Sequence, residues 1–313
     1  MAPVLTTLRL ALGDIKLAHS VFAMPFALLA TAMALPRELP APRIATLFAL
    51  IICCMFLART WAMLINRIAD AHFDRENPRT AQRAIAAGRL ARRDATIVAA
   101  ACALLFIAAT LGFLVLLRNP WPAILSAPVL LWIAFYSFTK RFTASAHFFL
   151  GGALAVSPIA ALIAINPQLL GLPLPITNPW TAPTPTGQAA LWLAGFVLLW
   201  VAGFDIAYAL QDRAFDRTRG LHSLPAKLSI SASLWAARAT HLAALACLVF
   251  ALRTEPRFGA LTTTAAALVT LTLICEHLVL HRRGLAGLPL AFFTLNGLIS
   301  ITLGALGLID LWH

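Results

Sequence analysis

The sequence predicts an all-α, polytopic membrane protein, and its composition and its apolar runs are the evidence. Of 313 residues, 61% are hydrophobic and only 12% are charged, and the mean hydropathy is +0.85. These values lie far from the averages of soluble domains. Because a helix needs about 20 apolar residues to cross a bilayer, apolar runs of about 18 residues or more mark candidate spans. We therefore predict nine transmembrane helices, at 17–35, 44–65, 95–117, 121–138, 148–165, 189–210, 233–251, 258–280 and 288–309.

Lysine and arginine are concentrated in alternate loops of this nine-span arrangement. The formal net charge is +12, and 18 of the 24 basic residues fall on one side of the predicted membrane, against five on the other. The basic side of a membrane protein is normally the cytoplasmic one. We therefore expect a cytoplasmic N-terminus, with the proline-rich loop at 166–188 outside. This asymmetry explains the positive charge without a nucleic-acid partner.

A polar run at residues 66–93 interrupts the apolar segments. Asn66, Asp70 and Asp74 recur every four residues, so on a helix they share one face. Oxygen-bearing side chains suit Mg²⁺, which usually takes one or two carboxylates and completes its shell with substrate phosphates. Arg67, Arg75, Arg79 and Arg83 supply the positive charge that binds a phosphate. The run predicts a cytoplasmic catalytic segment at about 66–94.

A second acidic run follows at residues 205–219. Asp205, Asp212 and Asp216 are spaced seven and then four residues apart, which places them close together on a helical projection. A single D-x-x-x-D on an exposed helix is often only a solvated charged face. Here two such runs each end an apolar segment and are each followed by arginines, and this favours a second catalytic segment, at about 211–232.

Three further polar side chains are predicted to reach the same side. Tyr136 and Lys140 are four residues apart at the end of the fourth span, and Lys16 precedes the first span. Each lysine has two open readings: it binds an anionic substrate group, or it extends to the lipid headgroups. The five cysteines lie inside apolar helices without C-x-x-C spacing and indicate neither disulfides nor a metal site.

These residue types suit a Mg²⁺-bound diphosphate attached to a lipid tail. When the diphosphate is attached to an allylic carbon, charge neutralisation makes it a leaving group. The carbocation that remains must be kept from water in an apolar cavity until it meets a nucleophile. Asp205 is then a candidate for handling a proton.

The motifs resemble those of the UbiA superfamily of intramembrane prenyltransferases. Asn66, Asp70 and Asp74 match its N-x-x-x-D-x-x-x-D, and Asp212 and Asp216, with Tyr208 and Asp205 upstream, match its second motif. The stretches N-P-R-T-A-Q-R, Y-S-F-T-K-R-F-T and G-L-H-S-L-P resemble other recurrent segments of the family. The resemblance covers essentially the whole chain, 1–313. Many members carry aspartate directly after the motif asparagine, whereas this chain has Arg67, which offers a cation for the diphosphate in place of a metal ligand.

The resemblance implies nine helices around a central cavity, with an active site at the cytoplasmic side of the bacterial inner membrane. It implies Mg²⁺ at Asn66, Asp70, Asp74, Asp212 and Asp216, and a diphosphate near Asn66, Arg67, Arg79, Arg83, Lys16, Tyr208 and Lys140. The substrates would be a polyprenyl diphosphate and an aromatic acid, either 4-hydroxybenzoate or a dihydroxynaphthoate, in ubiquinone or menaquinone synthesis. Protein partners are not indicated.

An ion-coupled transporter is the alternative from another class of function. A transporter places its ionisable groups near the middle of the bilayer on broken helices. The carboxylates of this chain instead cluster at one membrane surface beside arginines, which favours the enzyme.

Overall fold

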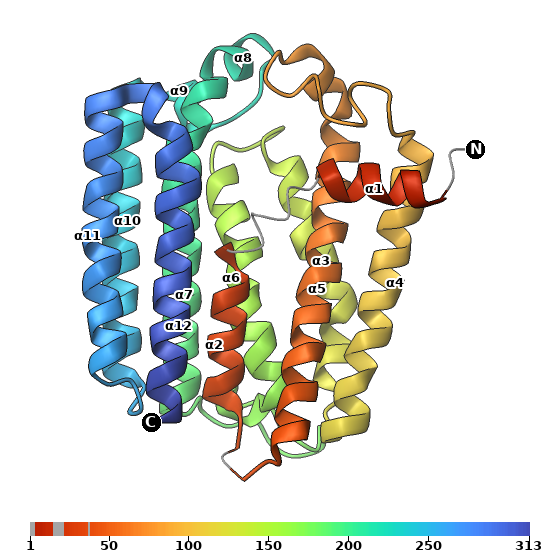
Figure 1. The fold of residues 1–313 in the computed structure, drawn as a ribbon, viewed down its shortest axis with the longest axis vertical. Helices are drawn as coiled ribbons and strands as arrows, with labels where there is room; N and C mark the ends of the chain where they lie inside the picture. The colour runs from red at the N-terminus through yellow and green to blue at the C-terminus, as the bar shows by residue number, and fades with distance from the viewer. Residues whose placement is uncertain (1–3, 15–21, 37) are drawn as a thin grey trace.

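Helices form all the regular structure in the described parts of the chain, which are residues 4–14, 22–36 and 38–313 of a computed structural model (Figure 1). No strand occurs within these ranges. The α-helices are α1 (Val4–Asp14), α2 (Met24–Ala34), α3 (Ala41–Glu76), α4 (Arg92–Leu117), α5 (Trp121–Thr139), α6 (Ala146–Ile165), α7 (Pro185–Tyr208), α8 (Arg213–Thr218), α9 (Leu224–Lys227), α10 (Ile230–Thr254), α11 (Ala260–Arg283) and α12 (Asn296–Trp312). The remaining short helices are η2 (Pro167–Leu170), η3 (Ala209–Asp212), η4 (Gly284–Gly287) and η5 (Leu290–Leu295).

Eight described helical segments are long and apolar enough to cross a membrane, which confirms the polytopic all-α prediction but not the count of nine. The ninth predicted span, 17–35, is represented by α2, an apolar helix of only 11 residues. A full span needs about 20 residues. Residues 17–21 of this predicted span lie outside the described residues, and so does Lys16, which precedes the span.

The second predicted span continues well beyond its expected end. It was expected to stop at residue 65, but α3 runs for 36 residues to Glu76. Asn66, Asp70 and Asp74 are therefore helical, as their four-residue spacing predicted, and the first part of the catalytic segment at 66–94 belongs to α3. The helix ends at Glu76 because Asn77, directly before Pro78, takes an extended conformation, and the Asn77 N–H caps the carbonyl of Phe73.

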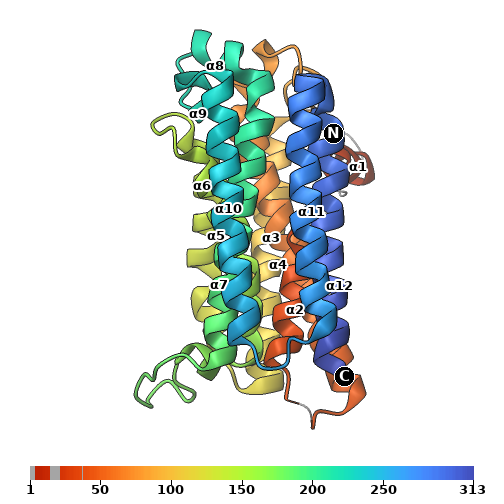
Figure 2. The same ribbon diagram turned by 90° about the vertical axis from the view of Figure 1, so that its left-hand side faces the viewer.

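The helices form a closed ring of neighbours. Along the ring, α2 packs on α3 and α12, α7 packs on α6 and α10, and α11 packs on α12. Two views at right angles show the long helices running side by side along the bundle (Figures 1 and 2). Of the spans, α7 is the most buried, and its Trp200 side chain is fully enclosed among Phe26, Phe196 and Phe204. This aromatic cluster forms the centre of the apolar core.

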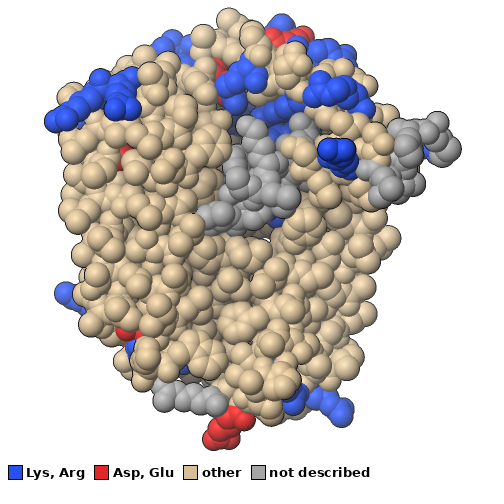
Figure 3. Space-filling view, in the orientation of Figure 1, with Lys and Arg blue, Asp and Glu red and all other residues tan. Residues whose placement is uncertain are grey.

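The loops that follow α3 and α7 lie at the same end of the bundle, next to α8 and α9 (Figure 1). The C-terminus lies at the opposite end. Lysine and arginine side chains gather at the end that carries α8 and α9, and the middle of the visible surface is almost free of charge (Figure 3). Both acidic segments are thus brought to the basic end of an apolar bundle.

Candidate active site

A cavity of about 650 Å³ lies among the helices from α2 to α7 and reaches the basic end of the bundle. Near that end its lining is polar and includes both acidic segments. The rest of the lining is apolar, with side chains such as Ile51, Phe106, Val129, Leu154 and Ile159. One end of the cavity therefore suits a charged group, and the other end suits a hydrocarbon chain.

The first acidic segment lines this cavity with all three of its predicted side chains. Asn66 Nδ2 donates to Asp70 Oδ2 at 3.1 Å, which follows from their spacing of one helical turn. Arg83 Nη1 lies 2.7 Å from one oxygen of Asp74 and 2.9 Å from the other. Arg141 Nη2 lies 3.2 Å from Asp70 Oδ1. Each carboxylate of this segment is thus next to a guanidinium group.

The second acidic segment faces the first across the cavity. Arg79 makes a two-point contact with the Asp212 carboxylate, with Nε 2.9 Å from Oδ1 and Nη2 bonded to Oδ2. Asn77 Nδ2 donates to the same Oδ1 at 3.0 Å. Asp216 accepts a hydrogen bond from Ser223 at 2.8 Å. The turn after α3 therefore reaches over to the end of α7 and joins the two acidic segments.

Arg79 also contacts Tyr208, because Nη1 lies 3.4 Å from the phenol oxygen and the guanidinium sits over the ring. Burial by itself would lower the pKa of Arg79, but the hydrogen bond and charge of Asp212 outweigh burial, so its pKa is raised. Arg79 consequently stays cationic at every physiological pH.

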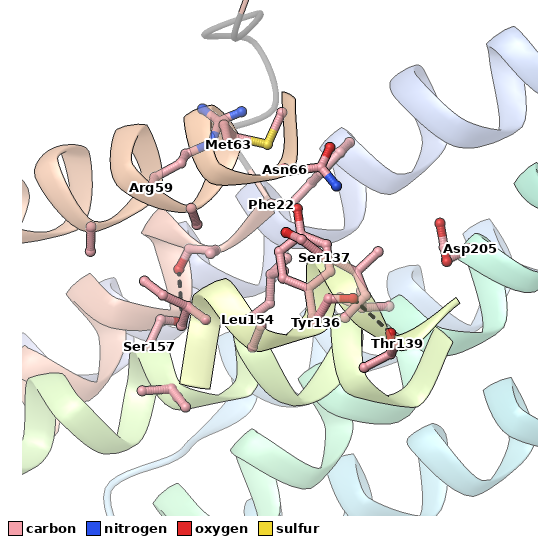
Figure 4. Close-up of a pocket in the computed structure, with 18 of the residues that line it drawn as sticks. Phe22, Arg59, Met63, Asn66, Tyr136, Ser137, Thr139, Leu154, Ser157 and Asp205 are labelled. Carbon is pink, nitrogen blue, oxygen red and sulfur yellow. Dashed lines mark hydrogen bonds between the residues drawn. The ribbon is translucent and has the colours of Figure 1, made fainter. Parts of the chain in front are cut away.

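Tyr136 and Lys140 both line the cavity from the end of α5, and Tyr136 lies near Asn66 and Asp205 (Figure 4). Burial alone would lower the pKa of Lys140, but the nearby carboxylates of Asp216, Asp205 and Asp212 raise it above its ordinary value. The ammonium group is thus held charged beside both acidic segments. This placement favours the substrate reading of Lys140 over extension to lipid headgroups.

Arg67 lies apart from the other predicted phosphate-binding residues. Its side chain is buried, does not line the cavity, and donates from Nη1 to Asn66 Oδ1 at 2.8 Å. One position along a helix turns a side chain by about 100°, so Arg67 points away from the face of Asn66. The structure places it as a support for Asn66 and not at the diphosphate end of the cavity. Lys16 lies outside the described residues.

The sequence reading did not single out three residues that contact the site: Asn77, Arg141 and His147. His147 Nδ1 lies 2.7 Å from Asp205 Oδ2. Asn77 and Arg141 stand directly in the quoted stretches N-P-R-T and T-K-R-F, so a search for polar neighbours of the motifs would have included them. His147 stands among apolar residues at the start of α6, and nothing in the linear sequence connects it with α7.

The oxygen donors of the two segments fit Mg²⁺. The candidates are Asn66, Asp70 and Asp74 on one side and Asp212 and Asp216 on the other, and all are hard ligands that line one cavity. Within the described residues, no three His, Cys, Asp or Glu side chains are close enough together to hold a metal by themselves. That donor set suits a metal whose remaining ligands come from phosphate oxygens.

Comparison with known proteins agrees with this geometry. A model of the UbiA prenyltransferase family matches residues 23–298. The curated 4-hydroxybenzoate octaprenyltransferase of Acidovorax ebreus is 32% identical over 176 residues, which are 56% of this chain and 53% of that protein. The enzyme of the same name from Nitrosomonas europaea is 31% identical over 186 residues, which are 59% of this chain and 55% of that protein. The aligned part thus spans about half the length of these curated relatives.

Solved structures share the fold over nearly the full chain. The apo structure of a UbiA homologue from Aeropyrum pernix K1 has a TM-score of 0.78 and 28% identity, covering 94% of this chain and 98% of that one. A UbiA homologue from Archaeoglobus fulgidus, solved with DMAPP and Mg²⁺, has a TM-score of 0.65 at 16% identity, covering 98% and 99%, which shows the fold alone. Because the family match extends over most of the sequence, this chain belongs to the UbiA prenyltransferase family.

Proposed function

We propose that this protein is a Mg²⁺-dependent prenyltransferase that moves a polyprenyl group from its diphosphate to a ring carbon of an aromatic acid. The observation that carries the proposal is that two carboxylate segments and their arginines lie at one end of the same, otherwise apolar cavity. That arrangement matches a substrate with a charged head and a hydrocarbon tail. The names of the curated relatives and the DMAPP and Mg²⁺ bound to the Archaeoglobus homologue support the same reaction class.

The diphosphate end is formed by the two acidic segments. Asn66, Asp70, Asp74, Asp212 and Asp216 would hold Mg²⁺, which supplies charge neutralisation to a departing diphosphate. Arg79, Arg83 and Lys140 line the same end and offer their N–H groups to phosphate oxygens. Tyr136 and Tyr208 stand beside them with polar hydroxyl groups. These donors stabilise the charge that grows as the allylic C–O bond breaks.

The acceptor would lie below this polar end. Arg59 lines the cavity two helical turns before Asn66 on α3 (Figure 4). A cation at that depth suits the carboxylate of an aromatic acid, which would orient the ring toward the allylic carbon. The apolar lining keeps water from the carbocation so that the ring carbon is the nucleophile that reacts.

The family and its fold also bear on the cellular location and the membrane orientation of the protein. We propose a multi-pass protein of the bacterial cytoplasmic membrane, with the N-terminus and both acidic segments in the cytoplasm, serving quinone synthesis. The basic end of the bundle supports this orientation, since basic loops normally stay in the cytoplasm.

The test is an assay of the purified protein in detergent or lipid with Mg²⁺, polyprenyl diphosphates of several lengths, and a panel of aromatic acids that includes 4-hydroxybenzoate and 1,4-dihydroxy-2-naphthoate. We expect one acid to gain the mass of the prenyl group, and Arg59→Ala to raise KM for that acid more than KM for the diphosphate. Asp74→Asn is the matched inactive control. Failure of the wild-type protein to prenylate any acid, with the diphosphate bound, would refute the proposal.

A further inference from the structure

His147 connects Asp205 to Leu224, which lies in the turn that follows the second acidic segment. The side chain is fully buried at the start of α6. Its Nδ1 lies 2.7 Å from Asp205 Oδ2 on α7, and its Nε2 accepts from the backbone N–H of Leu224 at 3.3 Å. The imidazole is therefore held at both nitrogens by elements that are distant in the sequence.

These two contacts fix the tautomer of the ring. A backbone N–H can only donate, so Nε2 must be the unprotonated nitrogen. The proton of the neutral imidazole then sits on Nδ1 and is donated to the Asp205 carboxylate. His147 thus acts toward Asp205 as a fixed hydrogen-bond donor.

Among the described residues, Asp205 differs from Asp70, Asp74 and Asp212 in having no ion pair with an arginine. His147 is the only hydrogen-bond partner of the Asp205 carboxylate among the described residues, whereas Asp216, which also lacks an arginine, is bound by Ser223. Because His147 occupies Oδ2, the other oxygen, Oδ1, is left to accept a proton. Asp205 and Tyr136 line the same cavity, from α7 and α5 respectively (Figure 4).

We propose that His147 is a positioning residue that holds Asp205 as the proton acceptor for the aromatic ring. The inference rests on the proposed function. In this step the C–C bond has formed between the allylic carbon and the ring carbon, and the allylic C–O bond to diphosphate has broken. The C–H bond at that ring carbon then breaks, its electrons restore the aromatic ring, and the proton moves to Asp205 Oδ1. Asp205 later passes the proton to water at the open end of the cavity.

The contact with Leu224 also links His147 to the residues around Asp216 and Lys140. Leu224 follows Ser223, which binds Asp216, and the His222 N–H donates to the carbonyl of Lys140 at 2.6 Å. The segment that carries these contacts therefore bridges α5, α6 and the second acidic segment. The His147 ring therefore lies next to the segment that binds Asp216, while its contact with Asp205 is the one that positions the proton acceptor.

Two variants of similar polarity separate the contacts of His147. In His147→Asn the side-chain amide nitrogen occupies the place of Nδ1, so it keeps the donor to Asp205 and loses the acceptor for Leu224. In His147→Gln the longer side chain reaches the place of Nε2, so it keeps the acceptor and loses the donor. A structural role alone would make the two substitutions similarly harmful.

The measurement is steady-state turnover with ordinary and ring-deuterated acceptor. We expect kcat of His147→Gln to fall about 100-fold, the size of loss that misplacing a reacting group produces, with KM for the prenyl diphosphate unchanged. Its isotope effect on kcat should exceed that of the wild type, because loss of the ring proton becomes slow. His147→Asn should retain most of the wild-type turnover and the wild-type isotope effect. Binding of a prenyl thiodiphosphate with wild-type affinity shows that both variants are folded.

Equal turnover in the two variants, or an unchanged isotope effect in His147→Gln, would overturn the inference. An inactive wild-type protein would refute the proposed function instead, so the two failures are distinguishable. Asp205→Asn, which keeps the hydrogen-bond geometry but cannot accept a proton, should be slower than His147→Gln. If it is not slower, Asp205 is not the acceptor.

Discussion

Gly151 is the position at which a single methyl group should disturb the fold and the site together. A Cβ atom added there would lie 2.1 Å from the backbone oxygen of Leu198 on α7, whereas ordinary contacts begin at 3.4 Å. The shortfall is about 1.3 Å, and a backbone carbonyl in the middle of a helix cannot rotate away. In Gly151→Ala, α6 and α7 must therefore separate.

The energetic cost follows from the packing of these two helices. Overpacking a close-packed interface typically costs about 1 to 3 kcal/mol. The separation would also act one helical turn away, where the Nδ1–Oδ2 distance between His147 and Asp205 is 2.7 Å. Moving the helices apart by about 1 Å takes this pair beyond hydrogen-bond range. Gly151→Ala should thus lower both the stability and the turnover.

Thermal unfolding of the purified protein, followed by size-exclusion chromatography, measures the stability, and product mass measures the turnover. Gly297→Ala is the control, since an added Cβ at Gly297 meets nothing within 4 Å and alanine is the better helix former. We expect the melting temperature to fall by several degrees in Gly151→Ala and not to fall in Gly297→Ala. Wild-type melting and wild-type turnover in Gly151→Ala would refute the reasoning, because the backbones would then have room for the methyl group.

Three further predictions concern charge and capping. Lys140→Ala should lower kcat by raising the activation barrier by roughly 2 to 4 kcal/mol, as for other groups that stabilise departing charge, while KM for the prenyl diphosphate changes little. Steady-state kinetics with an unaffected kcat would remove Lys140 from the mechanism. Asp74→Asn and Asp212→Asn should each lower turnover by orders of magnitude without unfolding the protein, and chelation of divalent metal should do the same to the wild type; activity that persists without metal contradicts this. Asp310→Ala should cost about 0.5 to 2 kcal/mol of stability, because Asp310 caps the start of α11 through the N–H groups of Gly259 and Thr262, and a melting temperature equal to the wild type would count against it.

The sequence predicts the helices well because membrane spans carry their signal locally. Apolar runs of sufficient length correspond to eight described spans, and the four-residue spacing of Asn66, Asp70 and Asp74 puts all three on one face of α3 in the cavity. These features depend on residues within a few turns of one another.

The interactions that the sequence does not reveal are those between distant segments. Arg79 pairs with Asp212 and His147 pairs with Asp205 across gaps of 133 and 58 residues. No periodicity records such contacts, because any arginine of the polar run is a chemically equivalent partner for either acidic segment. The position of Arg67 outside the cavity could have been predicted from the sequence. Once α3 is known to continue past residue 65, the rotation of about 100° between neighbouring helical residues turns Arg67 away from the face of Asn66.

The length of α3 has a consequence for the energetics of substrate entry. A helix of 36 residues is about 54 Å long, whereas the hydrocarbon core of a bilayer is about 30 Å thick. The last three turns of α3, which carry Asn66, Asp70 and Asp74, therefore project to the level of the lipid headgroups even if the helix is tilted. Under the proposed function, the anionic head of a prenyl diphosphate would bind at the depth that lipid headgroups occupy, and only its tail would enter the bundle. Phosphate charge would then not have to cross hydrocarbon, and the released diphosphate would leave into the aqueous phase.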